Sequence, residues 1–338
     1  MSLRRDAILR EMGLGHEQFW TPAARMADIV LPATVSLERD DIGYGSREPF
    51  VIAMKQARPP VGEARDDYWI FSQLAGRLGA GATFTEGRDT MQWLRHLYAE
   101  ARDKSAKAGV AIPDFDTFWA AGIAEAAGET RDPVMLSRFR QDPAAHPLRT
   151  PSGKIEIFSE RIASFGYDDC PGHATWFEPV EWLGSPKARQ YPLHMLSDQP
   201  NDKLHSQLDH SPHARSTKVR GRQPVTLHPD DAAARGIADG DLVRVYNDRG
   251  ACLAGAKLSD RIRRGVVRLS TGAWFDPADT GSNQPLEKHG NPNALTLDIG
   301  ASKLSQGCIA QTCLVEIERF DGPAPAVTAH RVPAFTER

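Results

Sequence analysis

One polar segment of the chain has the composition of a ligand-binding loop. Residues 197–208 read Ser-Asp-Gln-Pro-Asn-Asp-Lys-Leu-His-Ser-Gln-Leu and follow an apolar stretch that predicts a strand. Hydroxyl, amide, imidazole and ammonium groups in one loop can donate many hydrogen bonds to a polar, anionic ligand. A solvated surface loop would have the same composition, so both interpretations stay open at this point.

Three histidines in and after this segment raise the question of a metal site. His205, His210 and His213 lie on an expected loop, with no partnering Cys or Glu. Metal-binding histidines usually follow tighter patterns with a carboxylate nearby. The pattern favours imidazoles that donate hydrogen bonds to phosphate groups or base edges, and we predict no metal ligand in the chain.

Two pairs of adjacent carboxylates are further candidates for binding. Asp40-Asp41 and Asp66-Asp67 are typical of helix caps and solvated turns. A carboxylate can also accept two parallel hydrogen bonds from the N1–H and N2–H edge of guanine. The sequence alone leaves both roles open.

Local motifs for self-contained catalysis are missing from the sequence. It contains no G-x-S-x-G, no P-loop and no G-x-G-x-x-G that opens a helix. Cys308 has no basic neighbour and is expected to be inert. Trp274 and Phe275 follow an expected strand, where they could plug the end of a barrel or form a wall over a flat heterocycle.

Composition excludes several classes of protein. The 338 residues suggest two domains, and a net charge of -3 argues against a general nucleic-acid binder. No apolar run approaches the ~20 residues of a membrane span. Four cysteines without a C-x-x-C pair predict neither a disulfide scaffold nor an iron–sulfur site. No secretory signal is visible, and we expect a cytoplasmic setting.

The first part of the chain has the pattern of an α/β domain. An apolar run closed by proline at 27–32 predicts a buried strand. Apolar residues at helical spacing predict helices over 67–78, 91–98 and 115–123, while residues 128–152 have the composition of a surface connection.

The second part has the pattern of a β-barrel. Alternation predicts a strand at Lys154–Phe158, and further strands are expected at 193–196, 224–227, 242–246, 252–256, 266–269 and 313–317. A short helix at 229–236 interrupts them. Six short strands suggest a closed or nearly closed barrel of about 120–140 residues. We expect an α/β portion over 1–185, a barrel domain over 186–325 and a tail over 326–338.

Several longer motifs resemble the dimethyl sulfoxide reductase family of molybdopterin oxidoreductases. They are Phe-Trp-Thr-Pro-Ala-Ala-Arg-Met-Ala-Asp-Ile-Val-Leu-Pro-Ala at 19–33, Leu-Glu-Arg-Asp-Asp-Ile at 37–42, Ser-Gly-Lys-Ile-Glu-Ile-Phe-Ser at 152–159, Leu-His-Ser-Gln-Leu at 204–208, Asn-Asp-Arg-Gly-Ala-Cys-Leu-Ala-Gly at 247–255, Leu-Ser-Thr-Gly-Ala-Trp at 269–274, His-Gly-Asn-Pro-Asn at 289–293 and Gln-Gly-Cys-Ile-Ala-Gln-Thr at 306–312. The likeness runs from about residue 16 to about residue 325. The runs at 247 and 289 are most similar to biotin sulfoxide and trimethylamine N-oxide reductases.

This resemblance implies a fold, a cofactor and a reaction. The fold is an α/β portion followed by a six-stranded barrel of the double-psi type that caps the cofactor. The cofactor is molybdenum on two molybdopterin guanine dinucleotides. The reaction moves oxygen from a small S-oxide or N-oxide, such as biotin sulfoxide, methionine sulfoxide or trimethylamine N-oxide. Electrons come from an external donor, and the chemistry belongs to the cofactor.

The resemblance also implies which residues contact the cofactor. Near a guanine nucleotide it places His16, Glu17, Arg39 and Asp67, the last as the carboxylate that reads guanine. Loops around the pterin and the diphosphate are expected to contribute Ser197, Asp198, Gln199, Pro200, Lys203, His205, Ser206 and Gln207. The remaining polar contacts fall to Asn293, Ala310, Gln311 and Thr312. Relatives often carry arginine where this chain has Lys203, so a point charge replaces a bidentate fork there.

Family members are considerably longer than this chain. The resemblance therefore implies a carboxy-terminal part whose partner is the missing amino-terminal half, in the same or another polypeptide. That half would carry the serine ligand of molybdenum, so we predict no catalytic residue here. An export signal on it would make the enzyme periplasmic. The alternative is a catalytically silent remnant that serves as a nucleotide-binding or assembly module. A large exposed apolar patch would favour the fragment, as does the apolar stretch Ile29–Leu31.

Overall fold

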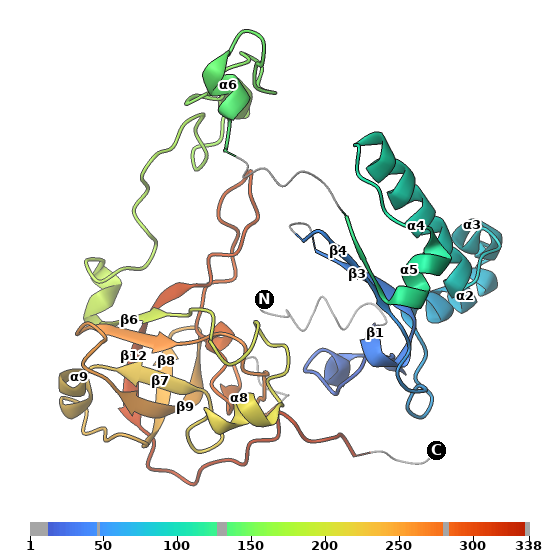
Figure 1. The fold of residues 1–338 in the computed structure, drawn as a ribbon. Coiled ribbons are helices and arrows are strands. Elements are labelled where there is room, and N and C mark those ends of the chain that lie inside the picture. The colour runs from blue at the N-terminus through green and yellow to red at the C-terminus, as the bar shows by residue number, and fades with distance from the viewer. Residues whose placement is uncertain (1–12, 46–47, 127–133, 280–283, 335–338) are drawn as a thin grey trace. The chain divides into compact units, whose positions relative to one another are not determined.

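The protein folds into two compact units (Figure 1). The computed structural model describes residues 13–45, 48–126, 134–279 and 284–334. The amino-terminal unit comprises Met12–Phe19 and Met26–Arg140, and the barrel unit comprises Trp20–Arg25 and the chain from Gln141 onward. The domain boundary expected near residue 185 stays a prediction.

The amino-terminal unit begins with two short parallel strands. β1 (Leu14–Glu17) pairs with β2 (Ile29–Pro32), and a parallel bridge from Ala33 to Arg65 extends the arrangement. Helix α2 (Asp67–Arg77) follows at once, because the Asp66 side chain accepts a hydrogen bond from the Trp69 N–H and so caps the first turn. The carboxyl ends of two parallel strands and the start of a helix therefore meet at one edge, where α/β folds bind ligands.

A second sheet in this unit is antiparallel and rests on helices. Its order is β3 (Asp41–Tyr44), β4 (Phe50–Met54) and β5 (Ile123–Glu125). Helices α3 (Gly81–Thr85), α4 (Thr90–Lys107) and α5 (Phe115–Ala121) complete the unit. The core between the sheet and α4 and α5 contains Ala53, Leu94, Tyr98, Phe115, Phe118 and Ala124. The helices predicted over 67–78 and 91–98 are confirmed. The helix predicted over 115–123 ends at Ala121, because Gly122 has a left-handed backbone and Ile123 begins β5.

The barrel unit contains a closed mixed barrel of six strands, as predicted. The strands run β9 (Gly250–Leu258), β7 (Pro224–Leu227), β10 (Val266–Leu269), β6 (Leu193–Leu196), β12 (Thr312–Arg319) and β8 (Leu242–Asn247), and a β8–β9 pairing closes the ring. One edge of β9 pairs with β8 along its length, and the other pairs with β7 and with the short β11 (Leu286–Glu287). The interior is filled by aliphatic side chains, including Leu193, Met195, Val225, Leu269 and Val315.

Short helices occupy the connections of this unit. They are α6 (Ser137–Gln141), α7 (Glu160–Ala163), α8 (Pro212–Ser216) and α9 (Pro229–Ala233), with α6 spanning the point at which the two units divide. The described residues of the two units also form the 3₁₀ turns η1 (Ala24–Met26), η2 (Ser36–Glu38), η3 (Pro186–Arg189) and η4 (Pro292–Ala294), of which η2 belongs to the amino-terminal unit. None of the helices in the described ranges is both long enough and apolar enough to cross a membrane.

The strand predicted at Lys154–Phe158 is wrong. These residues are described and form turns and irregular chain, with Ile157 88% exposed. Alternation stabilises a strand only where another strand pairs with it and one face is buried. No strand in the described part of the chain pairs with this segment.

A buried ion pair fixes the chain that enters the barrel. The Glu181 carboxylate accepts hydrogen bonds from both terminal nitrogens of Arg249, at 2.6 and 2.9 Å. It also accepts hydrogen bonds from the Lys187 ammonium and the Leu314 N–H. Burial raises the pKa of Glu181, but the hydrogen bonds from Arg249 and Lys187 outweigh burial and lower the pKa from 4.5 to about 2. Charged hydrogen bonds of this kind attach the segment 181–187 to the turn between β8 and β9 and to β12.

Substitution Glu181→Gln should destabilise the protein and flatten its response to acid. The pKa of Glu181 is lower in the folded state, so its contribution is present above pH 4.5 and is lost as the pH falls toward about 2. Removing one partner of a buried pair costs about 3–5 kcal/mol. Urea unfolding at pH 7 and at steps below pH 4.5 measures both effects.

The matched control for this substitution is Glu318→Gln. Glu318 pairs with Arg244 at the surface, where both side chains are exposed, and the expected cost is about 0–1 kcal/mol. Equal losses for the two variants would contradict the assignment of Glu181 as a buried anchor.

Candidate cofactor site

A hollow of about 530 Å³ lies at the ligand edge of the amino-terminal unit. Its walls come from the end of β1, the residue after β2 and the first turns of α2. They consist of Leu14, His16, Glu17, Gln18, Ala33, Asp67 and Phe71. Three of the residues predicted near a guanine nucleotide, His16, Glu17 and Asp67, therefore lie together.

His16 and Asp67 are joined directly in this hollow. The His16 Nδ1 atom lies 3.0 Å from Asp67 Oδ1, and the imidazole packs against the Phe71 ring at 4.8 Å between centroids. The His16 Nε2 atom is buried and has no hydrogen-bond partner within the described residues. A buried polar atom without a partner is uncommon in folded proteins and indicates a place where a polar ligand can bind.

The structure separates the roles of the paired carboxylates. Asp66 is the cap of α2, and Asp40 accepts a hydrogen bond from the Gln56 N–H. Asp41 accepts the guanidinium of Arg39 at 2.9 Å, so Arg39 is held at the end of η2. Of the four carboxylates, Asp67 alone lines the hollow, with 61% of its side chain exposed. The cap interpretation therefore applies to Asp66 and leaves Asp67 available to a ligand.

Strand register brings the second group of predicted residues to one end of the barrel. β10 runs parallel to β6, with Arg268 opposite Leu196, so the chain leaves both strands at the same end. β12 runs antiparallel to β6, with Thr312 opposite Leu196, so β12 begins at that end. The loop after β6, the loop after β10 and the stretch Ala310–Thr312 must therefore meet there.

Hydrogen bonds connect these loops to one another. The Ser197 N–H donates to Gln311 O at 2.7 Å, and the Ser270 hydroxyl donates to Asp198 Oδ1 at 2.6 Å. The Trp274 indole N–H donates to Ser206 O at 2.8 Å. Within the loop, Gln199 Nε2 donates to Lys203 O, and Pro200 is half-buried. His205, Ser206 and Gln207 are among the exposed residues of the loop.

Asn293 belongs to a neighbouring loop that is tied to the same end. Asn291 donates from its side chain to Ala273 O at 2.9 Å, and its Oδ1 atom accepts the Asn293 N–H. Asn293 itself is exposed, at the tip of η4. The structure thus gathers residues 197–207, Asn293 and 310–312, whereas their contacts with a cofactor stay predictions.

A buried glutamate that the sequence analysis did not identify holds the Asn293 loop. Glu287 is fully buried and accepts hydrogen bonds from four backbone N–H groups, those of Asp276, His289, Gly290 and Asn291. Burial raises the pKa of Glu287 to about 7, although the four donors oppose this shift. Glutamate is normally exposed, so the sequence carries no signal for this role.

The Lys203 ammonium points into the protein. Its Nζ atom lies 3.1 Å from Gln223 Oε1, 3.3 Å from Asp209 Oδ1 and 3.6 Å from Asp202 Oδ1, and the side chain is fully buried. The diphosphate contact expected for Lys203 stays a prediction. In the structure, the buried positive charge of Lys203 compensates the negative charge of the neighbouring Asp209 carboxylate.

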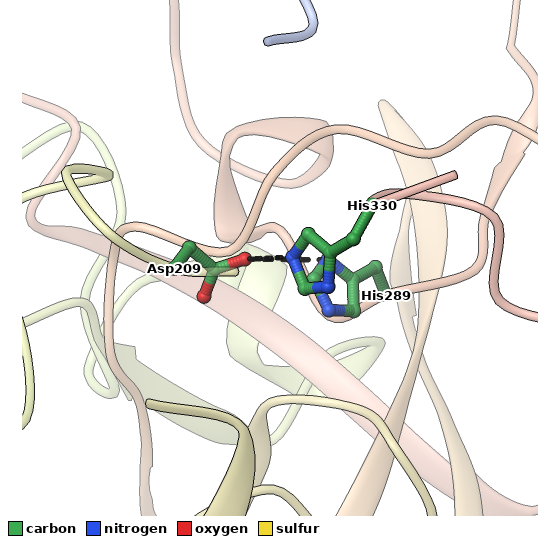
Figure 2. Close-up of side chains that lie close together, drawn as sticks. All are labelled: Asp209, His289 and His330. Carbon is green, nitrogen blue, oxygen red and sulfur yellow. Dashed lines mark hydrogen bonds and ion pairs between the residues drawn. The ribbon is translucent and has the colours of Figure 1, made fainter. Parts of the chain in front are cut away.

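Asp209, His289 and His330 form a cluster whose possible ligand atoms lie within 4.8 Å of one another (Figure 2). This cluster does not have the character of a metal site. Lys218 and Lys203 already place ammonium groups 2.8 and 3.3 Å from Asp209 Oδ1. His289 Nδ1 is hydrogen-bonded to Trp274 O at 2.9 Å. A divalent cation would be repelled by two ammonium groups at this distance.

Trp274 has a structural role, which resolves the alternatives left open by the sequence. The residue is buried, its indole packs against His210 and His330, and its N–H is used by Ser206 O. Trp274 packs against loop residues and is not part of the aliphatic core of the barrel, so its burial favours a packing role among the loops over a wall for a heterocycle. Cys308 is a free, exposed cysteine in the loop before β12.

Comparisons with known families define the class of protein. Residues 193–314 match the family model "Molydopterin dinucleotide binding domain", and residues 16–77 match the family model "Molybdopterin oxidoreductase". The first match covers five strands of the barrel and the beginning of β12, and the second covers the hollow around His16 and Asp67. The chain belongs to the molybdopterin oxidoreductases.

Comparison with individual relatives narrows the class of molybdopterin oxidoreductase that the chain resembles. The chain is 48% identical over 327 residues to a dimethyl sulfoxide/trimethylamine N-oxide reductase of Rhodobacter capsulatus, covering 95% of this chain and 39% of the relative. It is 50% identical over 309 residues to a biotin sulfoxide reductase of Cereibacter sphaeroides, covering 91% and 41%. The predicted resemblance to the dimethyl sulfoxide reductase family is confirmed, and with it the implied cofactor, molybdenum on two molybdopterin guanine dinucleotides.

The chain spans about two fifths of the length of these relatives. A solved structure shows the same proportion: acetylene hydratase from Pelobacter acetylenicus matches with a TM-score of 0.68 and 21% identity, over 91% of this chain and 40% of that one. At this identity the match supports the fold alone.

Substitution Gly272→Ala should disturb the loop at the end of the barrel. Gly272 has a φ of +100°, and a Cβ atom there would lie 1.9 Å from His205 O. We expect a loss of about 1–3 kcal/mol, as for overpacking, in addition to the cost of the left-handed backbone. Urea unfolding measures the loss.

Gly236→Ala is the matched control. Gly236 also has a positive φ, of +62°, but open space surrounds the added Cβ. This control should show only the backbone cost of about 1 kcal/mol. If the Gly272 variant lost no more stability than the control, the close approach of the two loops would be contradicted.

Proposed function

We propose that this chain is the cofactor-capping part of a molybdenum-dependent reductase of S-oxides or N-oxides, of the biotin sulfoxide, methionine sulfoxide or trimethylamine N-oxide type. The observation that carries the proposal is the gathering of polar loops at one end of a closed barrel in a molydopterin dinucleotide binding domain. The names of the relatives support the reaction class.

The residues present fit such a cofactor. The hollow of the amino-terminal unit offers a carboxylate and a buried, partnerless imidazole nitrogen, which suit the hydrogen-bonding edge of guanine. The end of the barrel offers hydroxyl, amide and imidazole donors, which suit a pterin and a diphosphate. For the guanine nucleotide we propose His16, Glu17, Arg39 and Asp67. For the pterin and diphosphate we propose Ser197, Asp198, Gln199, Pro200, Lys203, His205, Ser206, Gln207, Asn293, Ala310, Gln311 and Thr312.

When bound, the cofactor supplies the oxygen-atom and electron transfer of the reaction. The substrate oxide takes up two electrons and two protons and gives the reduced compound and water. The residues of this chain bind and orient. Asp67 accepts hydrogen bonds from guanine, His16 holds that carboxylate, and the loops after β6 and β10 fix the position of the dinucleotide. No proton-transfer role is assigned to a residue of this chain.

We propose that the partner of this chain is the part of the reductase that corresponds to the remaining three fifths of its relatives. Residues 155–182 support this proposal, because they carry large exposed apolar side chains and form no hydrophobic core of their own. These are Ile155, Ile157, Phe158, Phe165, Trp176, Phe177, Val180 and Trp182. Exposed apolar side chains gathered in one segment are typical of protein interfaces. An external electron donor and the cytoplasmic setting stay predictions.

The composition of the purified complex tests the proposed function. The chain is produced in a host that makes the cofactor, alone and together with the amino-terminal three fifths of the Cereibacter sphaeroides biotin sulfoxide reductase. The complex should contain close to one molybdenum and two guanines per chain and should reduce biotin sulfoxide with a reduced viologen dye. A complex that forms without molybdenum and guanine would instead support a silent assembly module.

Substitution Asp67→Asn should weaken guanine nucleotide binding. An amide presents one acceptor and one donor to an edge that carries two donors, and a hydrogen bond to a charged group contributes about 1.5–3 kcal/mol. Binding of GDP to the full chain, measured by calorimetry, should weaken about tenfold or more. Binding of inosine diphosphate, which lacks the N2 amino group, should weaken less.

Asp66→Asn is the matched control, because asparagine caps helices as well as aspartate does. This control should bind GDP as the unchanged chain does. Equal affinities in both variants would contradict the role of Asp67.

A further inference from the structure

Asp209 connects four separate segments at the end of the barrel. The carboxylate is fully buried and directly follows the loop that carries His205, Ser206 and Gln207. The Nζ atoms of Lys203 and Lys218 lie 3.3 and 2.8 Å from its Oδ1 atom. Its Oδ2 atom receives the Trp274 N–H at 3.2 Å and His330 Nε2 at 3.0 Å, the contact drawn in Figure 2.

The loop next to Asp209 has a backbone that needs support. His205 and Leu208 have φ values of +51° and +57°, although neither is glycine. Left-handed residues of this kind cost free energy and persist only where surrounding contacts hold them. Leu208 is exposed, so its own side chain does not supply that support.

Two anchors hold this loop, one on each side of Leu208. On one side the Trp274 indole N–H donates to Ser206 O. On the other side the Asp209 carboxylate is fixed by the cations and by the Trp274 backbone. The loop can keep its shape only while both anchors keep theirs.

His330 contacts both anchors. Its Nε2 atom is hydrogen-bonded to Asp209, and its ring packs against the Trp274 indole with 5.3 Å between centroids. Burial would raise the pKa of Asp209, but the hydrogen bond to His330 and the charge of Lys218 outweigh burial and lower it. The carboxylate is thus a charged acceptor for His330.

The segment that carries His330 is built into the barrel unit. Thr328 donates from its N–H and its hydroxyl to Asp276, each at 2.6 Å, and Arg222 donates to Pro325 O at 2.6 Å. Lys288 donates to the Thr328 hydroxyl at 2.9 Å, and Ala329 is buried. These contacts fix the backbone next to His330 and so give its imidazole a defined position.

We propose that His330 is a positioning residue for the loop His205–Gln207, so that the carboxy-terminal segment is a working part of the cofactor site. This inference rests on the proposed function, since the loop matters to activity only if it holds the dinucleotide. His330 acts through Asp209 and Trp274 and does not itself contact the cofactor.

Hydrogen exchange on the full chain tests the positioning without any cofactor. In His330→Ala, amides of residues 203–209 should exchange at least about tenfold faster, because local opening becomes easier. In His330→Gln they should return to the original rate, because the glutamine amide can donate to Asp209 in place of Nε2. His213→Ala, at an exposed histidine of α8, is the control and should leave the loop unchanged.

Guanine content tests the second half of the inference. The complex with the amino-terminal portion should lose guanine nucleotide in His330→Ala and retain it in His330→Gln. Unchanged exchange at 203–209 in the alanine variant would overturn the inference, as would faster exchange with full guanine content. If the unsubstituted complex held no guanine, the proposed function would fail instead, while the exchange data would still decide the positioning contact.

Discussion

A carboxylate buried away from water must be surrounded by donors, and this constraint organises the end of the barrel. Glu181, Asp209 and Glu287 are all buried there. Glu181 is compensated by Arg249 and Leu314, and Asp209 by His330, all of which are distant along the chain, while Lys218 lies nearer to Asp209. Glu287 is compensated by backbone N–H groups of its own and the preceding loop. An uncompensated buried charge would cost several kcal/mol, so the segments that supply the donors cannot separate freely.

The closed barrel makes this arrangement possible. Because β10 is parallel to β6 and β12 is antiparallel to it, three connections meet at one end. Those connections are rich in polar residues and lie outside the aliphatic interior. The barrel therefore serves as a rigid support, and the buried carboxylates decide the conformations of the loops upon it. A dinucleotide that needs several donors at defined places is suited to such a surface.

The amino-terminal unit also brings polar groups together, but it compensates them less completely. Two short parallel strands and the start of α2 leave a hollow whose polar groups are Glu17, Gln18 and the His16–Asp67 pair. Here the polar atoms are only partly compensated, and His16 Nε2 has no partner in the described structure. The buried carboxylates Glu181, Asp209 and Glu287 of the barrel unit are hydrogen-bonded, although His289 Nε2 in that unit also has no partner among the described residues. In the hollow, the His16 Nε2 atom is left for a ligand.

The sequence by itself determined the family, the six strands of the barrel and the three main helices of the α/β unit, because motif and periodicity are local properties of a chain. It could not determine which of Asp66 and Asp67 caps α2, whether Trp274 is a plug, or where the charge of Lys203 points. It also predicted a strand at Lys154–Phe158 that does not form, since a strand needs a pairing partner. Glu287 carried no signal because glutamate is normally exposed, and His330 carried none because its role depends on Asp209, 121 residues away. Only the tertiary structure decided these points: burial and hydrogen-bond compensation arise when distant segments meet.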